Sequence, residues 1–344
     1  MDAQCGDKRD VDRGQPMTEL QIGVVLEAFA DTPLPKVLDW LVQAAPDVTQ
    51  VELGAGGYAP RTHCDASTLL ANPTERRRWQ AELDVRGLTV SALNAWGNPL
   101  HPDRDISSRH AADLRDTIRL AAELGVDRLV ALAGCPGASA ADTMPHFAGG
   151  GWLPYLENVW DRQWLEVGAP FWSGISEFAQ QTHPALRICL ELHPGKLVYN
   201  VDTFGRLAEL GENLAANLDP SHFFWQSMDA LAIVKALGPR IGYCHAKDVR
   251  FIPQNLALNG VMDRRWPNPP DRMPWNFATV GQGQGRDREW WSEFVQAIAK
   301  HTQSRTLSIE HEDPFVPATE GVPLAAEVLR AALDAGRGQP AIVS

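Results

Sequence analysis

The sequence predicts a single (β/α)8 barrel, because strand-like and helix-like segments alternate eight times along it. Each expected strand is a short run rich in Ile, Leu, Val or Ala that stops at Pro, Gly or a polar cluster, and a helical pattern follows. Such alternation specifies a parallel sheet with helical crossovers. No linker rich in Pro, Gly or Ser divides the 344 residues, which favours one closed barrel over a doubly wound open sheet, the structural alternative.

The expected elements follow the chain in strict alternation. The strands are expected at 21–29, 48–54, 88–96, 127–134, 187–193, 215–222, 241–248 and 306–313. The helices are expected at 35–45, 65–86, 106–124, then one that ends near 181, then 203–210, 230–237, 287–301 and 324–335. Two connections are longer than a barrel needs, namely 135–158 after the fourth strand and 250–285 after the seventh. Loops of that length are typical of lids and binding loops, and both would extend over the same barrel mouth.

The charge and the cysteines restrict the class of protein. The chain has 31 Lys and Arg against 43 Asp and Glu, a formal net charge of -12, whereas a surface that tracks phosphates needs clustered cations. No apolar stretch approaches the roughly 18 residues of a membrane span. Five scattered cysteines without a CxxC pair are typical of reduced thiols in the cytoplasm. We therefore expect a cytoplasmic enzyme with a small-molecule substrate and neither nucleic acid nor membrane as a partner.

The N-terminal residues stand apart from the barrel pattern. Residues 1–18 are polar and charged, without the hydrophobic region of a signal peptide. We expect them to form a disordered tail, which leaves 19–344 as the catalytic barrel.

Four expected strands end in side chains that bind metals, namely Glu191, Asp219, His245 and Glu310. Such a group at the end of a buried strand is costly unless a partner compensates it, and a divalent cation does so. The wide spacing means that the four meet only if their strands lie side by side. Three carboxylates and one imidazole predict a single Mn²⁺, with Mg²⁺, Co²⁺ or Zn²⁺ as alternatives. For any one of them alone, the alternative is a core carboxylate paired with Lys or Arg.

These motifs resemble the sugar phosphate isomerase/epimerase family of xylose isomerase-like barrels, over residues 20–336. Members of that family hold one divalent cation with Glu, Asp, His and Glu from the last four strands, which matches the four residues above. They also carry a His three residues after the Asp, here His222, which contacts substrate hydroxyls. In the epimerases of the family the first and last Glu act as acid and base. The resemblance therefore implies these catalytic roles for Glu191 and Glu310.

The same residues are suited to removing a proton next to a carbonyl group. A metal chelated by a carbonyl oxygen and its neighbouring hydroxyl acidifies the adjacent C–H, a carboxylate takes the proton, and the metal holds the enediolate. The sequence thus predicts an isomerase or epimerase that acts on a keto-sugar. Lys247 lies two residues after His245 on the same strand face and would place a cation near the enolate oxygen. Its alternative role is a salt bridge to Asp248 or to a carboxylate at the rim.

Other polar and aromatic side chains are expected to line the pocket. His193 shares a strand face with Glu191 and either binds substrate or orients that carboxylate. Glu27 and Glu52 are candidates from the first and second strands. The remaining expected substrate contacts are Asn94, Trp96, His101 and Trp152, with Trp225 and Trp275 as further aromatic faces for stacking on a sugar. Each of these residues alone has an alternative role in packing or in a loop.

His146 lies in the loop after the fourth strand, just before the glycine run at 149–151. It can serve at the mouth as a second base or as a leaving-group acid, or it merely bonds within its loop. This histidine and the long loops resemble the catalytic subunits of bacterial C-glycoside deglycosidases, which cleave 3-oxo-glycosides and work with a small partner subunit. That resemblance implies a second function, a lyase in which His146 is the base for β-elimination.

Three alternatives concern assembly and class. The chain is expected to form either a homo-oligomer or a hetero-oligomer with a small partner subunit. A non-catalytic sugar-binding barrel is disfavoured by the intact Glu191 and Glu310. A metal-dependent endonuclease of abasic DNA on the same fold is disfavoured by the acidic charge and the lack of further zinc ligands.

Overall fold

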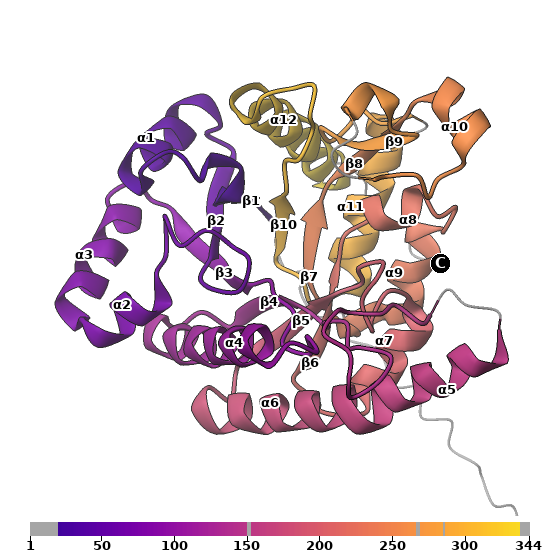
Figure 1. Cartoon of the computed structure of the whole chain (residues 1–344). Helices are drawn as coiled ribbons and strands as arrows, with labels where there is room; N and C mark the ends of the chain where they lie inside the picture. The colour runs from indigo at the N-terminus through magenta and orange to yellow at the C-terminus, as the bar shows by residue number, and fades with distance from the viewer. Residues whose placement is uncertain (1–19, 150–152, 266–268, 285, 338–344) are drawn as a thin grey trace, which may run out of the picture.

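The computed structural model describes residues 20–149, 153–265, 269–284 and 286–337, and it shows a closed barrel of eight strands surrounded by helices (Figure 1). Neighbouring strands of the barrel are parallel and follow one another in chain order, with β10 closing the barrel against β1. The predicted (β/α)8 fold class is therefore confirmed. The expected N-terminal tail lies outside the described residues. Within those residues, no helix combines the length and the apolarity that crossing a membrane needs.

The barrel strands lie close to their expected positions. They are β1 (Gln21–Val25), β2 (Val48–Gly54), β3 (Thr89–Ala95), β4 (Arg128–Leu132), β5 (Arg187–Glu191), β6 (Leu214–Leu218), β7 (Ile241–Ala246) and β10 (Thr306–Ile309). The helices are α1 (Leu34–Ala44), α2 (Ala66–Ala71), α3 (Pro73–Asp84), α4 (Arg104–Leu124), α5 (Pro154–Arg162), α6 (Ala169–Thr182), α7 (Val201–Ala208), α8 (Ser221–Phe224), α9 (Ala230–Leu237), α10 (Pro253–Asn259), α11 (Arg288–His301) and α12 (Ala318–Arg337). A π-helical segment, Gln163–Gly168, joins α5 to α6.

The single helix expected at 65–86 is two helices, α2 and α3. Pro73 has no amide hydrogen to continue the first helix. The side chain of Asn72 accepts hydrogen bonds from the backbone N–H groups of Thr74 and Glu75, so it begins the second helix as its N-cap. The first strand is also shorter than expected, since Leu26–Phe29 form a 3₁₀-helix at the end of β1.

Residues 250–285, expected as one long loop, contain regular structure. β8 (Asp248–Phe251) and β9 (Trp275–Ala278) pair antiparallel and form a separate two-stranded sheet. In Figure 1 this pair lies beside α10, at the C-terminal side of β7. The strands are four residues each and lie far apart in the sequence, so no local turn signal marks them.

The barrel interior changes from apolar to polar toward the C-terminal ends of the strands. An inner cluster of buried residues consists of Ala92, Val130, Cys189, Ala215 and Tyr243. Side chains two residues apart point to the same face of a strand. The next inward positions on β3, β5, β6 and β7 are therefore Asn94, Glu191, Asn217 and His245, and all are buried. This polar layer forms the floor of the candidate site.

A buried carboxylate anchors the connection that follows β7. Asp248 is fully buried and lies 2.7 Å from the Nε atom of Arg286 through its Oδ1 atom. Its Oδ2 atom accepts hydrogen bonds from the backbone N–H groups of Gly281 and Gly283 and from the indole N–H of Trp291. One side chain thus ties β8 to the segment that leads into α11.

We expect Asp248→Ala to lower the free energy of unfolding by about 3–5 kcal/mol, because it removes a buried carboxylate that pairs with Arg286 and accepts three N–H hydrogen bonds. Urea unfolding followed by circular dichroism measures the change. The matched control is Asp263→Ala in the same connection, which removes an exposed pair with Arg265 and should leave the unfolding midpoint unchanged. Equal midpoints for the two variants would contradict the anchoring role of Asp248.

Candidate metal centre

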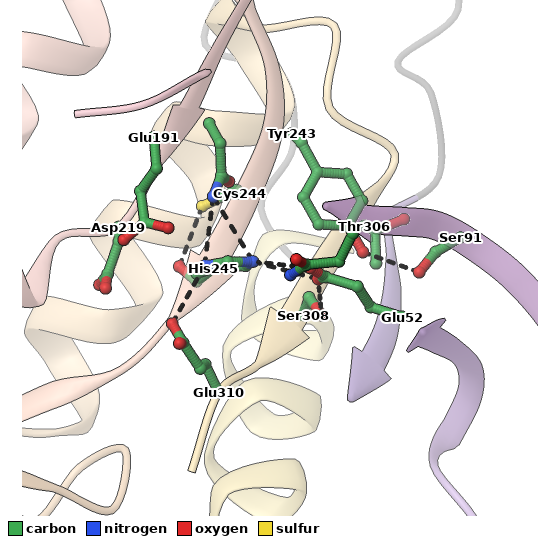
Figure 2. Close-up of polar contacts among 12 residues, drawn as sticks. Glu52, Ser91, Glu191, Asp219, Tyr243, Cys244, His245, Thr306, Ser308 and Glu310 are labelled. Carbon is green, nitrogen blue, oxygen red and sulfur yellow. Dashed lines mark hydrogen bonds and ion pairs between the residues drawn. The ribbon is translucent and has the colours of Figure 1, made fainter. Parts of the chain in front are cut away.

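Four side chains with metal-binding atoms converge at the C-terminal end of the barrel. Glu191 ends β5, Asp219 follows β6, His245 lies in β7 and Glu310 follows β10. All four are buried, and one ligand atom from each lies within 4.8 Å of those from the others. Figure 2 shows Glu191 and Asp219 on one side of the imidazole of His245, with Glu310 near its ring. The structure thus brings together the four residues that the sequence singled out.

A carboxylate orients the imidazole of His245, as is usual for an imidazole that binds a metal. Its Nε2 atom lies 3.0 Å from Oε2 of Glu52, and its Nδ1 atom lies 3.1 Å from Oε2 of Glu310. Glu52 in turn accepts a hydrogen bond from Asn94 at 3.0 Å. It accepts another from Ser308 at 2.9 Å (Figure 2). A carboxylate on one ring nitrogen fixes the orientation of the ring, and Nδ1, on the side of Glu310, is the nitrogen that would bind a metal ion.

The donor set and its charge fit a hard divalent cation. The Oδ2 atom of Asp219 is buried and makes no hydrogen bond of acceptable geometry within the described residues, although Nζ of Lys247 and Nε2 of His222 lie 3.1 and 3.3 Å away. A buried carboxylate oxygen without a hydrogen bond is costly. Three carboxylates and an imidazole around this point match the oxygen-rich sites of such ions.

Lys247 supplies positive charge to the same group of carboxylates. Its Nζ atom lies 2.7 Å from Oε2 of Glu310 and 2.8 Å from Oε2 of Glu312. Burial acts to lower the pKa of Lys247, but Asp219, Glu310 and Glu312 outweigh it and raise that pKa well above its usual value. Burial also acts to lower the pKa of His245, but Glu52 and Glu310 outweigh it and raise that pKa well above its usual value. The site therefore attracts cations strongly.

Glu191 is the proposed ligand that also contacts a second group, formed by two further histidines. His222 Nε2 is 2.8 Å from Oε1 of Glu191, and the ring of His193 lies 4.4 Å from that of His222, centroid to centroid. Burial raises the pKa of Glu191 to about 7, and Glu310 adds to the shift. Burial also lowers the pKa of His193 to about 4. Glu191, His193 and His222 form a second group with ligand atoms close enough to share a cation, so the two histidines line the centre directly.

The other predicted pocket residues lie in different parts of the structure. Trp96 stands edge-on to His245, with ring centroids 5.9 Å apart, and Asn94 supports Glu52. The Nδ1 atom of His101 accepts a hydrogen bond from the backbone N–H of Asp103, just before α4. Trp152 lies outside the described residues. Substrate contact by these residues stays a prediction.

His146 is exposed in the loop after β4. Its backbone N–H donates to the carbonyl of Pro136, and its own carbonyl accepts from the side chain of Gln163. These bonds fix the loop backbone rather than the imidazole. The predicted role of His146 as a base therefore depends on a contact with substrate itself.

Sequence reasoning named Trp225 and Trp275 as aromatic faces but missed Phe277, which the second sheet places near the centre. Phe277 of β9 lies 4.3 Å from Nζ of Lys247, measured to the ring centroid, and 5.8 Å from the ring of His222. Trp225 and Trp275 stack with centroids 4.9 Å apart and an interplanar angle of 12°. The one available signal was the alternation of Trp275 and Phe277 in a short run, which places both rings on one face of a strand.

Comparison with known proteins places the whole barrel among related folds. A family model described as "Xylose isomerase-like TIM barrel" matches residues 51–332. The uncharacterized protein YfiH of Bacillus subtilis (strain 168) is 29% identical over 314 residues, which is 90% of this chain and 98% of YfiH.

Solved structures of low sequence identity share the fold. The probable 3-DHS dehydratase AsbF from Bacillus anthracis has a TM-score of 0.59 at 15% identity and is matched over 90% of this chain and 99% of AsbF. IolI with a bound zinc atom has a TM-score of 0.60 at 14% identity, over 94% of this chain and 100% of IolI. An L-ribulose 3-epimerase has a TM-score of 0.56 at 15% identity, over 93% and 100%.

We expect Glu52→Gln to weaken Mn²⁺ binding by about 10- to 100-fold, because the amide no longer holds His245 as a carboxylate does. Titration calorimetry on metal-free protein measures the affinity. Asp219→Asn, which alters a proposed ligand, should weaken it at least as much. Glu82→Gln alters a half-exposed carboxylate on α3 and serves as the control. Wild-type affinity in Glu52→Gln would contradict its supporting role.

Proposed function

The chain belongs to the xylose isomerase-like TIM barrel family, and we propose on that basis that it is a divalent-metal-dependent enzyme acting on a keto-sugar. The reaction that the site supports best is isomerisation or epimerisation through removal of a proton next to the carbonyl group. The observation that carries this proposal is the convergence of two glutamates, an aspartate and a histidine from the last four barrel strands.

The metal ion has one task in this proposal. A divalent cation held by Glu191, Asp219, His245 and Glu310 supplies a Lewis acid that polarises the carbonyl group and acidifies the neighbouring C–H. Mn²⁺ is the ion that we expect. The structure of IolI contains a bound zinc atom, which is consistent with a divalent ion on this fold.

In this proposal Glu191 and Glu310 move the proton. They come from β5 and β10, which β6 and β7 separate in the barrel, so they approach the centre from different strands. One takes the proton from carbon, and the other returns a proton to the opposite face. His222, 2.8 Å from Glu191, orients that carboxylate. Lys247, 2.7 Å from Glu310, stabilises negative charge that develops on a substrate oxygen.

The second sheet limits the access of water to this chemistry. Phe277 packs near Lys247 and His222, and the stacked Trp225 and Trp275 lie next to it. Aromatic faces pack against the C–H faces of sugars. Exclusion of water strengthens the interaction of Lys247 with a charged substrate oxygen.

An elimination reaction is the second candidate. The same loss of a proton can be followed by departure of a group from the β-carbon, and this chain shares its fold both with an L-ribulose 3-epimerase and with AsbF, a probable dehydratase. In this alternative the substrate is a 3-oxo-glycoside. His146 stays its predicted base, from an exposed position in the loop after β4.

Glu191→Gln and Glu310→Gln should each reduce turnover by at least about 100-fold while the protein stays folded, because an amide cannot take up the proton. Deuterium exchange into ketoses, with Mn²⁺-loaded protein, measures the rate, and circular dichroism checks the fold. The exposed Glu289→Gln on α11 is the matched control and should retain wild-type exchange. Near-normal exchange in either site variant would show that the assigned acid or base is wrong.

The two candidate reactions give different products in deuterated water. We expect Mn²⁺-loaded protein to introduce deuterium into a recovered free ketose, because the proton that leaves carbon is replaced from solvent. Mass spectrometry of a panel of ketoses measures this. Parallel incubations contain 3-oxo-glucosides with a chromogenic aglycone. If the aglycone is released and no ketose takes up deuterium, the reaction is elimination and the proposal of epimerisation is wrong.

A further inference from the structure

Two groups of ligand atoms at the barrel mouth share the carboxylate of Glu191. The first group is the candidate metal centre, and the second consists of Glu191, His193 and His222. In each group, one ligand atom from every residue lies within 4.8 Å of those from the others. A carboxylate has two oxygens, each with lone pairs, so Glu191 can serve both groups. His193 and His222 take no part in the first group, which leaves their ring nitrogens available to a second ion.

His193 begins a tight turn that fixes its imidazole. Its backbone carbonyl accepts a hydrogen bond from the backbone N–H of Lys196 at 3.2 Å, and Gly195 has a φ of 80°, as in a type II turn with Pro194 before the glycine. The Nδ1 atom of His193 lies 2.7 Å from the carbonyl oxygen of Pro194. Because a carbonyl oxygen only accepts, Nδ1 carries the proton and Nε2 keeps a lone pair. A backbone carbonyl fixes the imidazoles of many metal sites in this way.

His222 approaches the same carboxylate from the connection that follows β6. It lies in α8, three residues after Asp219, and is buried. Its Nε2 atom is 2.8 Å from Oε1 of Glu191 and 3.3 Å from Oδ2 of Asp219. The rings of His193 and His222 lie 4.4 Å apart between centroids. A metal ion here would replace the proton that His222 shares with Glu191, since a ligand imidazole binds through an unprotonated nitrogen.

The charge at the mouth leaves room for a second cation. Five carboxylates gather there, and they belong to Glu52, Glu191, Asp219, Glu310 and Glu312. Lys247 contacts three of them, and Lys196 lies near enough to Glu191 to interact with it. When the carboxylates are ionised, two ammonium groups and one divalent ion carry one charge fewer than they do. A second divalent ion is therefore attracted to this end of the barrel.

The donor atoms of the second group differ from those of the first. Two imidazoles and one carboxylate are the protein ligands of many catalytic zinc sites, in which a fourth position stays open to water or substrate. The first group has three carboxylates and one imidazole, which suit a harder ion. The second group therefore favours Zn²⁺ or Co²⁺ over Mg²⁺.

We propose that Glu191, His193 and His222 form a second site, beside the first, for a divalent cation of the Zn²⁺ or Co²⁺ class. The second site rests on the proposed function, because Glu191 is a ligand of both ions. Two divalent ions that share a carboxylate hold neighbouring oxygens of one substrate and neutralise charge that develops on either. The open fourth position of the second ion is available to such an oxygen.

The test titrates metal-free, full-length protein with Co²⁺, an ion that accepts both donor sets and whose visible absorption changes with its ligands. Equilibrium dialysis with elemental analysis counts the bound ions, and calorimetry gives their affinities. We expect two Co²⁺ ions per chain in the wild type. His193→Ala should weaken one of them by at least about 100-fold, because loss of a ligand costs more than loss of a group that supports a ligand. The other ion should keep its wild-type affinity, which also shows that the variant is folded.

A second variant separates the two sites. Glu310→Gln alters a ligand of the first group only, so it should weaken the ion that His193→Ala leaves intact. His183→Gln is the matched control, because it changes an imidazole that pairs with Asp127 before β4, and it should keep both ions.

Each contrary outcome identifies the site that fails. One Co²⁺ ion per wild-type chain, weakened by Glu310→Gln and not by His193→Ala, overturns the second site and leaves the proposed function standing. Two ions that His193→Ala leaves at wild-type affinity overturn the second site as well. Binding that Glu310→Gln does not change overturns the first centre and with it the proposed function. Wild-type protein that binds no Co²⁺ overturns both sites.

Discussion

Negative charge buried at the C-terminal end of the barrel is the constraint on which the rest of the site depends. Glu52, Glu191, Asp219 and Glu310 are all buried there, and carboxylates in such a position require positive charge close by. Within the described residues, Lys247 supplies part of it through three carboxylate contacts. The remaining demand is one that a divalent cation held by these residues would meet.

The barrel builds this centre in layers. The cluster of Ala92, Val130, Cys189, Ala215 and Tyr243 fills the interior near the middle of the strands. On β3, β5, β6 and β7 the next inward position, two residues further on, is polar. His245 connects the layers, because Glu52 contacts one of its nitrogens and Glu310 the other. A change at Glu52 therefore acts on the metal centre through the imidazole, although Glu52 is not itself a proposed ligand.

The segment after β7 contributes both to the stability of the fold and to the candidate site. Asp248 follows Lys247 directly and bonds Arg286 and two backbone N–H groups, which fixes the start of β8. The pairing of β8 with β9 then places Phe277 over Lys247. Two adjacent residues thus have different roles. Lys247 contacts the carboxylates of the centre, and Asp248 holds β8, and with it the aromatic side chains of β9, in place.

The sequence by itself determined the fold class and the four side chains of the candidate centre. Periodic apolar runs report local strand and helix structure directly, and parallel strands in a closed barrel end at the same mouth. For that reason Glu191, Asp219, His245 and Glu310 could be predicted to meet although they lie far apart in the chain.

Only the tertiary structure decided which neighbours complete that centre. The bond between Glu52 and His245 joins residues 193 positions apart, and β8 pairs with β9 without a local turn. Within the part of the chain that the structure describes, Oε1 of Glu27 and Nε1 of Trp96 are buried without a hydrogen-bond partner, which only the placement of the other side chains shows. Periodicity reports which face a side chain occupies, whereas hydrogen-bond partners across a barrel depend on strand register and on side-chain conformation, which no local pattern encodes.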